Sequence, residues 1–251
     1  MTQKMDAYAI TDIGRKRTLN QDYAYLSLSR VGILPNLFVV ADGMGGHRGG
    51  GYASRLAVET ILSEIEKSGE ESPSQLLVDA IREANARVRQ AACEDEMLAG
   101  MGTTVVAATC LEGALEVANV GDSRLYVVNE KEIRQITQDH SLVEEMVRFG
   151  GLSREQARRH PDRNIITRAV GAEDDLKVDC FFVPLQEGDK VLLCSDGLTS
   201  MLEDEEIRRI LESGADVEAC AQALVEAANN HGGRDNIAVI IIEPFSDEVS
   251  R

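Results

Sequence analysis

Four short β-type runs follow one another between residues 103 and 135, and this block constrains the fold more than any other feature. The runs are Thr103–Leu111, Ala114–Val120, Arg124–Asn129 and Glu132–Gln135. Turn residues join them at 112–113, 121–122 and 129–131, so we expect an antiparallel meander. Such a block is not the strand–helix–strand alternation of a parallel sheet.

The remaining elements also come in groups. Further strands are expected at 6–13, 23–29, 36–41, 178–183, 190–195 and 236–242, and helices at 53–67, 73–88, 141–149, 153–159, 204–211 and 217–228. The chain shows no internal repeat and no long linker. We therefore predict an α+β fold in which antiparallel sheets carry helices on the outside, as one domain over residues 1–251 with a frayed tail at 246–251.

The charge balance limits the partners. The chain has 43 acidic and 26 basic residues, a net charge of -17, which argues against nucleic acid and anionic membranes because both need a basic surface. The longest apolar run, 237–242, is too short to span a bilayer, and the first residues show no signal-peptide pattern. We expect a cytoplasmic protein, taken to be a monomer.

Cysteine usage supports the same compartment. The five cysteines are odd in number and none forms a C-x-x-C pair, so a zinc site is not expected. Most lie in apolar runs, as reduced thiols in a protein core do.

Four acids stand at the ends of apolar runs: Asp42, Asp122, Asp196 and Asp235. Each alone fits an ordinary turn. Asp42, however, is followed by six glycines in nine residues and then by a helix, not by a partner strand. Asp196 also leads into a helix. Both strands therefore deliver a carboxylate to a sheet edge, and the glycine loop after Asp42 is not expected to be a packing element.

Converging strand ends would form a site made of oxygen atoms. Such a donor set favours Mg²⁺ or Mn²⁺ over zinc or copper, and several carboxylates cannot stay ionised together without cations. Two such ions can share a carboxylate and a hydroxide, an arrangement suited to in-line attack on phosphate. Arg15, Lys16 and Arg17 lie in the loop 14–22, where an arginine could bind phosphate oxygens. The alternative is a solvated basic loop.

Other phosphoryl chemistries lack their required residues. No cysteine has an arginine six positions later, and no D-x-D-x-[TV] sequence occurs. The glycine loop matches neither G-x-x-x-x-G-K-[ST] nor G-x-G-x-x-G, so it is not a nucleotide-binding loop of either kind. Kinase landmarks such as H-R-D are also missing.

Eight motifs together resemble a known family. In chain order they are GRKRTLNQD, VVADGMGG, GMGTTVVAA, VANVGDSRLYVV, ITQDHS, NIITRAVG, LLCSDGLT and GGRDNIAVI. The set resembles the metal-dependent serine/threonine protein phosphatases (PPM, or type 2C) over residues 8–242, and the variant Asp-Gly-Met-Gly-Gly is similar to the short bacterial branch. The resemblance implies an α-β-β-α sandwich of two antiparallel sheets flanked by helix pairs.

The resemblance also implies metal ligands. Asp42 would bridge two Mn²⁺ or Mg²⁺ ions, and the Gly43 carbonyl would bind the second ion. Asp196 and Asp235 would complete the first ion's ligands. Asp122, together with Asp196, would serve a third and weaker ion.

Further roles follow from the same resemblance. Asp22 would hold metal-bound waters, Arg17 would bind the substrate phosphate, and Asn236 would orient Asp235. Residues 141–171 correspond to a flap beside the catalytic cleft, in which Ser153 and His160 are candidate accessory contacts. Five flap arginines form a basic island that could contact an acidic partner or be an ordinary solvated surface: Arg154, Arg158, Arg159, Arg163 and Arg168.

Two positions depart from the family pattern. Met44 stands where the eukaryotic branch has a histidine proposed as general acid, and a thioether cannot donate a proton. Protonation of the leaving group then falls to metal-bound water or another residue, or matters little for good leaving groups. His47 is near in sequence, but loop histidines are usually solvated. Gln21 stands where many members have an acid, which would weaken outer contacts to the second ion.

We therefore expect a metal-dependent protein serine/threonine phosphatase. A metal-bridged hydroxide would attack phosphoserine or phosphothreonine directly, without a phosphoenzyme, and the enzyme would oppose a bacterial serine/threonine kinase. One alternative is a catalytically silent regulatory binding module, which would have lost ligands, whereas the four core acids are all present. Another is a phosphatase dedicated to one regulatory phosphoprotein, which differs only in its substrate.

Overall fold

The computed structural model describes residues 4–46, 49–69 and 72–246, which form two antiparallel sheets. The first sheet has the strand order β1 (Lys4–Asp12), β11 (Ile237–Ser246), β10 (Lys190–Cys194), β7 (Arg124–Val128) and β8 (Ile133–Gln135). The second has the order β2 (Asp22–Ser27), β3 (Leu37–Met44), β5 (Val105–Leu111), β6 (Ala114–Val120) and β9 (Asp179–Pro184), with β4 (Gly102–Thr103) paired to β3. All strand pairs are antiparallel.

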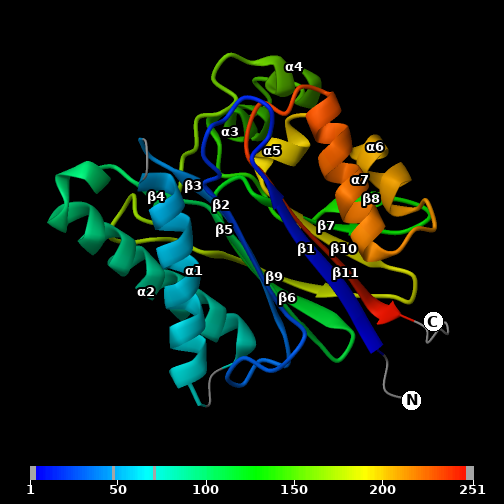
Figure 1. The fold of residues 1–251 in the computed structure, drawn as a ribbon, viewed down its shortest axis with the longest axis horizontal. Helices are drawn as coiled ribbons and strands as arrows, with labels where there is room; N and C mark the ends of the chain where they lie inside the picture. Colours follow the sequence, from blue (N-terminus) through cyan, green and yellow to red (C-terminus); the bar gives the residue numbers. More distant parts are fainter. Residues whose placement is uncertain (1–3, 47–48, 70–71, 247–251) are drawn as a thin grey trace.

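Helix pairs cover the outer faces of both sheets (Figure 1). α1 (Gly49–Lys67) and α2 (Pro73–Glu94) share an aliphatic core with the second sheet, whereas α6 (Asp204–Leu211) and α7 (Val217–Asn230) share one with the first. A third core of Val, Leu, Ile and Ala side chains fills the space between the sheets. Each fully buried Val, Leu or Ile contributes roughly 1.5–3 kcal/mol, so the layers hold together without a single buried Trp. The predicted α-β-β-α sandwich is confirmed.

The predicted meander is wrong at its centre. β5 pairs with β6 and β7 pairs with β8, but β6 and β7 lie in different sheets. The turn at Gly121-Asp122 carries the chain from one sheet to the other. Gly121 has φ +106° and a Cβ there would lie 2.5 Å from Thr104 Cγ2; because only glycine fits this conformation and this space, a sharp crossing is possible.

The prediction that the glycines after Asp42 form a loop without a packing role is also wrong. Gly49, Gly50 and Gly51 form the first turn of α1, four residues before the predicted start, and the first two are buried. A Cβ on Gly50 would lie 2.5 Å from the Gly43 oxygen, and a Cβ on Gly43 would lie 2.0 Å from the Gly50 oxygen. These glycines are therefore a packing element, since they let α1 touch β3 backbone to backbone.

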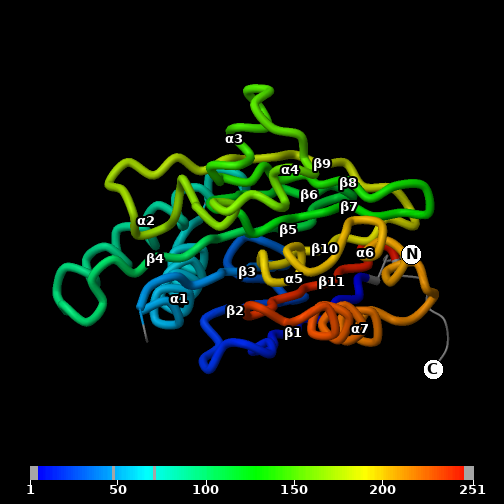
Figure 2. The backbone as a smooth tube through the Cα atoms, turned by 90° about the horizontal axis from the view of Figure 1, so that it is seen from above, coloured from blue at the N-terminus to red at the C-terminus, as the bar shows by residue number. Residues whose placement is uncertain are grey.

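The flap segment (residues 141–171) contains the short helices α3 (Leu142–Arg148) and α4 (Arg154–Arg159). Ser141 and Ser153 cap them, and Ser153 forms a complete capping box with Gln156. The Leu142 N–H donates to the Ile165 oxygen at 2.9 Å, which closes the base of the segment. Figure 1 shows this segment at the end of the sheets away from both termini, and Figure 2 shows part of its green trace projecting outward beyond α3.

The ends of the chain are only partly described. Ser246 belongs to β11 and was predicted to begin a frayed tail; the rest of that prediction, 247–251, lies outside the described residues. Among the helices that the structure describes, none combines the length and apolar character needed to cross a membrane.

Candidate metal centre

The acidic end of the sandwich (Asp22, Asp42, Asp122, Asp196 and Asp235) is assembled from both sheets. Asp22 and Asp42 are cross-strand partners in β2 and β3. Asp122 lies at the crossing from β6 to β7, Asp196 begins α5 (Asp196–Thr199), and Asp235 lies just before β11. The structure therefore brings together the four acids selected from strand ends, and adds Asp22 beside them.

Burial and repulsion between carboxylates raise the pKa values of four acids at this end. Burial raises the pKa of Asp22 to about 7 and that of Asp196 to about 6. Burial also raises the pKa values of Asp42 and Asp122 well above their usual range, and neighbouring carboxylates add to both shifts. These carboxylates would accept a cation readily, since it would remove the repulsion.

Two of the buried oxygens have no partner. Asp22 Oδ1 and Asp122 Oδ1 are both buried without a hydrogen bond, a costly state for a carboxylate. Within the described part of the chain, no three His, Cys, Asp or Glu side chains already form a cage for an ion. The orphaned oxygens and the all-oxygen donor set nevertheless fit a hard cation that is also bound by water and backbone carbonyls.

Thr103 of β4 and Thr104, which lies between β4 and β5, hold Asp42 in place. The Asp42 N–H donates to Thr104 Oγ1 at 3.0 Å, and its carbonyl accepts from Thr103 Oγ1 at 2.9 Å and from the Thr104 N–H at 2.9 Å. Thr104 Oγ1 is also 2.7 Å from Ser123 Oγ, next to Asp122. The two threonines of the GMGTT motif thus fix the backbone of Asp42 and link it to the Asp122 turn.

Ser195 joins the two sheets behind Asp22. Its hydroxyl donates to Asp22 Oδ2 at 2.6 Å and accepts from the Ala238 N–H at 2.9 Å. Ser195 is fully buried, so this bond is shielded from water. Ser195 therefore holds the Asp22 carboxylate through Oδ2, whereas Oδ1 is the oxygen without a hydrogen-bond partner.

Asn236 does more than was predicted from the sequence. Its backbone N–H donates to Asp235 Oδ1 at 2.9 Å. Its side chain instead holds the loop 13–21: Oδ1 accepts from the Gln21 N–H at 2.9 Å, and Nδ2 donates to the carbonyls of Ile13 at 3.0 Å and Leu19 at 2.9 Å. One buried amide thus joins Asp235 to the loop that carries Arg17.

Arg17 reaches the acidic end. Its Nη2 donates to Asp235 Oδ2 at 2.8 Å, and both side chains are partly exposed. The hydrogen bond and the charge of Asp235 raise the pKa of Arg17. The backbone N–H groups of Arg15 and Lys16 donate to the Gly233 oxygen at 2.7 and 3.2 Å. The basic loop is therefore docked beside the carboxylates, with Arg17 directed toward them.

The structure shows the contacts of Met44 and Gln21, the two residues that depart from the family pattern. Met44 ends β3 opposite Gly102 and offers no proton. The Gln21 carbonyl accepts from Ser54 Oγ at 2.6 Å, and its Nε2 donates to the Gly45 oxygen at 3.4 Å, so this residue supports the loop and α1. His47, considered as a substitute acid, lies outside the described residues.

The flap arginines are largely engaged with the protein itself. Arg158 donates to the Thr199 and Leu202 carbonyls at 3.2 and 2.9 Å, and Arg168 pairs with Asp179 at 2.8 Å. Arg154, Arg159 and Arg163 contact Glu144, Glu155 and the His160 carbonyl, respectively. Ser153 caps α4, and His160 Nδ1 accepts from the Asp162 N–H at 3.2 Å. Arg158 and Arg168 therefore serve the structure, whereas the side chains of Arg154 and Arg159 remain largely exposed.

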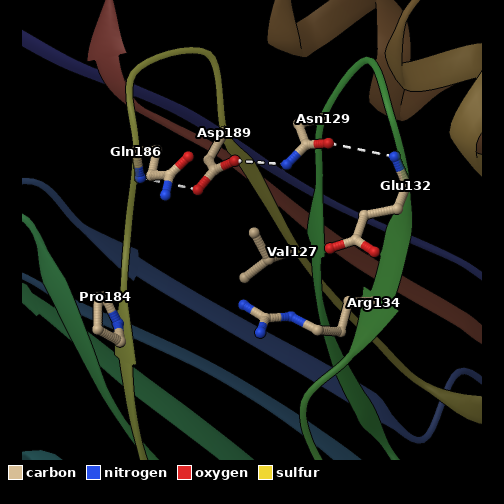
Figure 3. Close-up of a pocket in the computed structure, with 7 residues that line it drawn as sticks. All are labelled: Val127, Asn129, Glu132, Arg134, Pro184, Gln186 and Asp189. Carbon is tan, nitrogen blue, oxygen red and sulfur yellow. Dashed lines mark hydrogen bonds between the residues drawn. The ribbon is translucent and has the colours of Figure 1, made fainter.

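A separate cavity lies far from the acids (Figure 3). It measures about 160 Å³ between the β7–β8 turn and the β9–β10 connection. Its Asp189 accepts from Asn129 Nδ2 at 2.9 Å and from the Gln186 N–H at 2.8 Å. Asn129 and Asp189 adjoin the ends of β7 and β10 opposite Asp122 and Asp196. Asn129 and Asp189 therefore bond to each other at the end of the sheet opposite the acids.

Comparisons with known proteins show the family of this chain. Residues 14–236 match the family model for protein phosphatase 2C. The chain is 41% identical to the serine/threonine phosphatase stp of Listeria monocytogenes over 249 residues, which cover 95% of this chain and 96% of that protein. The crystal structure of Stp1 from Staphylococcus aureus has a TM-score of 0.89 at 35% identity and covers 95% of this chain and 94% of that chain.

A third relative is relevant to the metals. The catalytic domain of the phosphatase PstP in complex with two manganese ions has a TM-score of 0.84 at 30% identity, with 95% and 97% of the two chains covered. The chain thus belongs to the protein phosphatase 2C family. Its enzyme class, a metal-dependent serine/threonine protein phosphatase, is confirmed.

Proposed function

We propose that this chain hydrolyses phosphoserine and phosphothreonine in proteins at its acidic end, directly and without a phosphoenzyme. The convergence of Asp42 with Asp22, Asp122, Asp196 and Asp235, two of whose oxygens are buried and unpaired, supports this site. Bound Mn²⁺ or Mg²⁺ ions would supply Lewis-acid charge and activate water at neutral pH. No cysteine–arginine or aspartyl-phosphate motif offers an alternative nucleophile.

Each carboxylate would bind one or two particular ions. Asp42, which the GMGTT threonines hold rigidly, would bridge two core ions, and the Gly43 carbonyl would contact the second. Asp196 and Asp235 would complete the ligands of the first ion. Asp122, with its orphaned Oδ1, would bind a third ion together with Asp196. A relative's structure with two manganese ions supports the two core positions.

Asp22 and Arg17 would act around these ions. Asp22 is fixed by Ser195 through one oxygen, which leaves the other to hold ordered water. Arg17 would exchange its contact with Asp235 for a forked contact with the substrate phosphate. Asn236 positions the Arg17 loop and Asp235 together. Met44 cannot donate a proton, so another group must protonate the leaving oxygen.

The natural substrates would be proteins phosphorylated by a serine/threonine kinase, and the kinase itself would be one of them. The net charge of -17 supports a chain that acts without nucleic acid or a membrane surface. We further propose a monomeric, cytoplasmic enzyme in which residues 1–251 form one catalytic domain with a flap at 141–171.

Phosphate release from p-nitrophenyl phosphate and a phosphothreonine peptide tests this proposal. Release should require Mn²⁺ or Mg²⁺, stop in EDTA, and be lost in Asp42→Asn. A silent binding module would release no phosphate under any of these conditions. Phosphoproteomics that compares a deletion strain with an Asp42→Asn strain should then show the same accumulating phosphoproteins, which names the substrates and ties them to catalysis.

A further inference from the structure

The motif ITQDHS contains a histidine that the proposed chemistry does not use. His140 is buried and lies directly before the flap segment. Its Nδ1 accepts from the Gly121 N–H at 2.9 Å, while its own backbone N–H donates to the Gly121 oxygen at 3.0 Å. One residue therefore binds both polar groups of Gly121, the residue before Asp122.

These contacts define the protonation state of the ring. Because Nδ1 accepts a hydrogen bond, the ring proton resides on Nε2. Nε2 lies 3.1 Å from Asp179 Oδ2, to which it donates, and 2.9 Å from Arg168 Nη1. Arg168 Nη1 donates to the other oxygen, Asp179 Oδ1, at 2.8 Å. The neutral imidazole is thus oriented by a carboxylate that an arginine anchors in turn.

The same residue joins both ends of the flap segment. His140 precedes its first residue, and the His140 carbonyl accepts from the Thr167 N–H near its end at 2.8 Å. Arg168 follows Thr167 and reaches Asp179 in β9. The base of the flap, the start of β9 and the turn at Gly121 therefore meet at one residue, His140.

The turn that His140 holds has little freedom. Gly121 is pressed against Thr104, as described above, and Ser123 is bonded to the same threonine. Asp122 lies between these two fixed residues, and its Oδ1 is buried without a partner. A shift of the Gly121 N–H would therefore change the direction in which the Asp122 carboxylate points.

We propose that His140 is a positioning residue: its neutral ring sets the direction of the Asp122 carboxylate and couples that direction to the base of the flap segment. The inference rests on the proposed role of Asp122 as a metal ligand. It extends that role by assigning control of the Asp122 site to a residue that touches neither ion nor substrate.

Two variants at position 140 distinguish a positioning role of the His140 ring from a role in packing alone. The amide oxygen of His140→Asn lies near the position of Nδ1 and can still accept from the Gly121 N–H. The longer side chain of His140→Gln places its amide near Nε2 and loses that contact. Calorimetric titration of Mn²⁺ into the metal-free full chain is the readout, with the melting temperature of each variant measured alongside.

The weakest Mn²⁺ binding event of the wild type should be lost in Asp122→Asn, which identifies it. His140→Gln should weaken that event by about 10- to 100-fold, and His140→Asn by less than about 3-fold. Equal weakening in both variants, or none in His140→Gln, would overturn the inference while leaving Asp122 as a ligand. An unchanged titration in Asp122→Asn would overturn the ligand role and the inference together.

If His140→Gln does not fold, His140→Ala provides the same test, since it also removes the acceptor of the Gly121 N–H. It should weaken the same binding event by about 10-fold, the lower end of the range for supporting residues. An unchanged Mn²⁺ titration in that variant would count against His140 as a positioning residue.

Discussion

Replacing Asn236 by alanine should impair catalysis more than its loss of stability explains. The side chain is 4% exposed and makes three hydrogen bonds to the loop 13–21. Each is worth about 1 kcal/mol net, so the variant should lose roughly 3 kcal/mol of unfolding free energy, or about 6–12 °C in melting temperature for a chain of this size. The loop carries Arg17, so kcat/KM for a phosphothreonine peptide should fall about 100-fold, equivalent to about 2.7 kcal/mol.

Asn36→Ala is the matched control. Asn36 is also a buried asparagine, bonded through its side chain to both backbone groups of Cys110 at 3.0 and 2.7 Å. It adjoins the end of β3 far from Asp42. Its replacement should lower the melting temperature comparably while kcat/KM at 25 °C stays within about 2-fold of the wild type. Equal kcat/KM values in the two variants would refute the coupling through Asn236.

Three further predictions concern the acids and Arg17. Asp42→Asn should reduce Mn²⁺-dependent phosphate release on the order of 10³-fold and raise the melting temperature of the metal-free protein by removing a repelling charge; release above a tenth of the wild type would contradict the bridging role. The metal-free protein should lose stability as the pH rises from 5 to 7.5, because Asp22 and Asp196, with pKa values of about 7 and 6, hold protons when folded that the unfolded chain has already released. Calorimetry in EDTA checks this, and Mn²⁺ should raise the melting temperature more at pH 7.5 than at pH 5.5; a smaller Mn²⁺ effect at high pH would argue against it. Arg17→Lys should raise KM for the phosphopeptide about 10-fold, since lysine keeps the charge but loses the forked contact; an unchanged KM would exclude Arg17 as the phosphate contact.

The layers of the fold could be predicted because periodicity and turn chemistry are local properties of the sequence. The change of sheet at Gly121 could not, since a Gly-Asp-Ser turn looks the same whether the next strand stays in the sheet or leaves it. The start of α1 at Gly49 was missed for a related reason. Glycine is a poor helix former, and only the close approach of Gly43 and Gly50 explains why glycines begin this helix.

Four acids of the site could be found because each stands at the end of an apolar run, whereas Asp22 was found only through the family resemblance. Their supports could not be identified in the same way. Thr104, Ser123 and Ser195 are ordinary hydroxyl residues in sequence, and their contacts join segments from different sheets. Asn236 was expected to serve Asp235, but its side-chain partners lie more than two hundred residues away along the chain. Such hydrogen bonds depend on the topology of the fold, which local sequence patterns do not predict.

The central claim is that the acidic end binds the ions that drive phosphate release. Mn²⁺ titrated calorimetrically into the EDTA-treated chain, with phosphate release from a phosphothreonine peptide followed in parallel, tests it most directly. We predict at least two Mn²⁺ ions per chain and release that rises with their binding, both lost in Asp42→Asn. Full phosphate release in EDTA, or unchanged Mn²⁺ binding in Asp42→Asn, would contradict the claim.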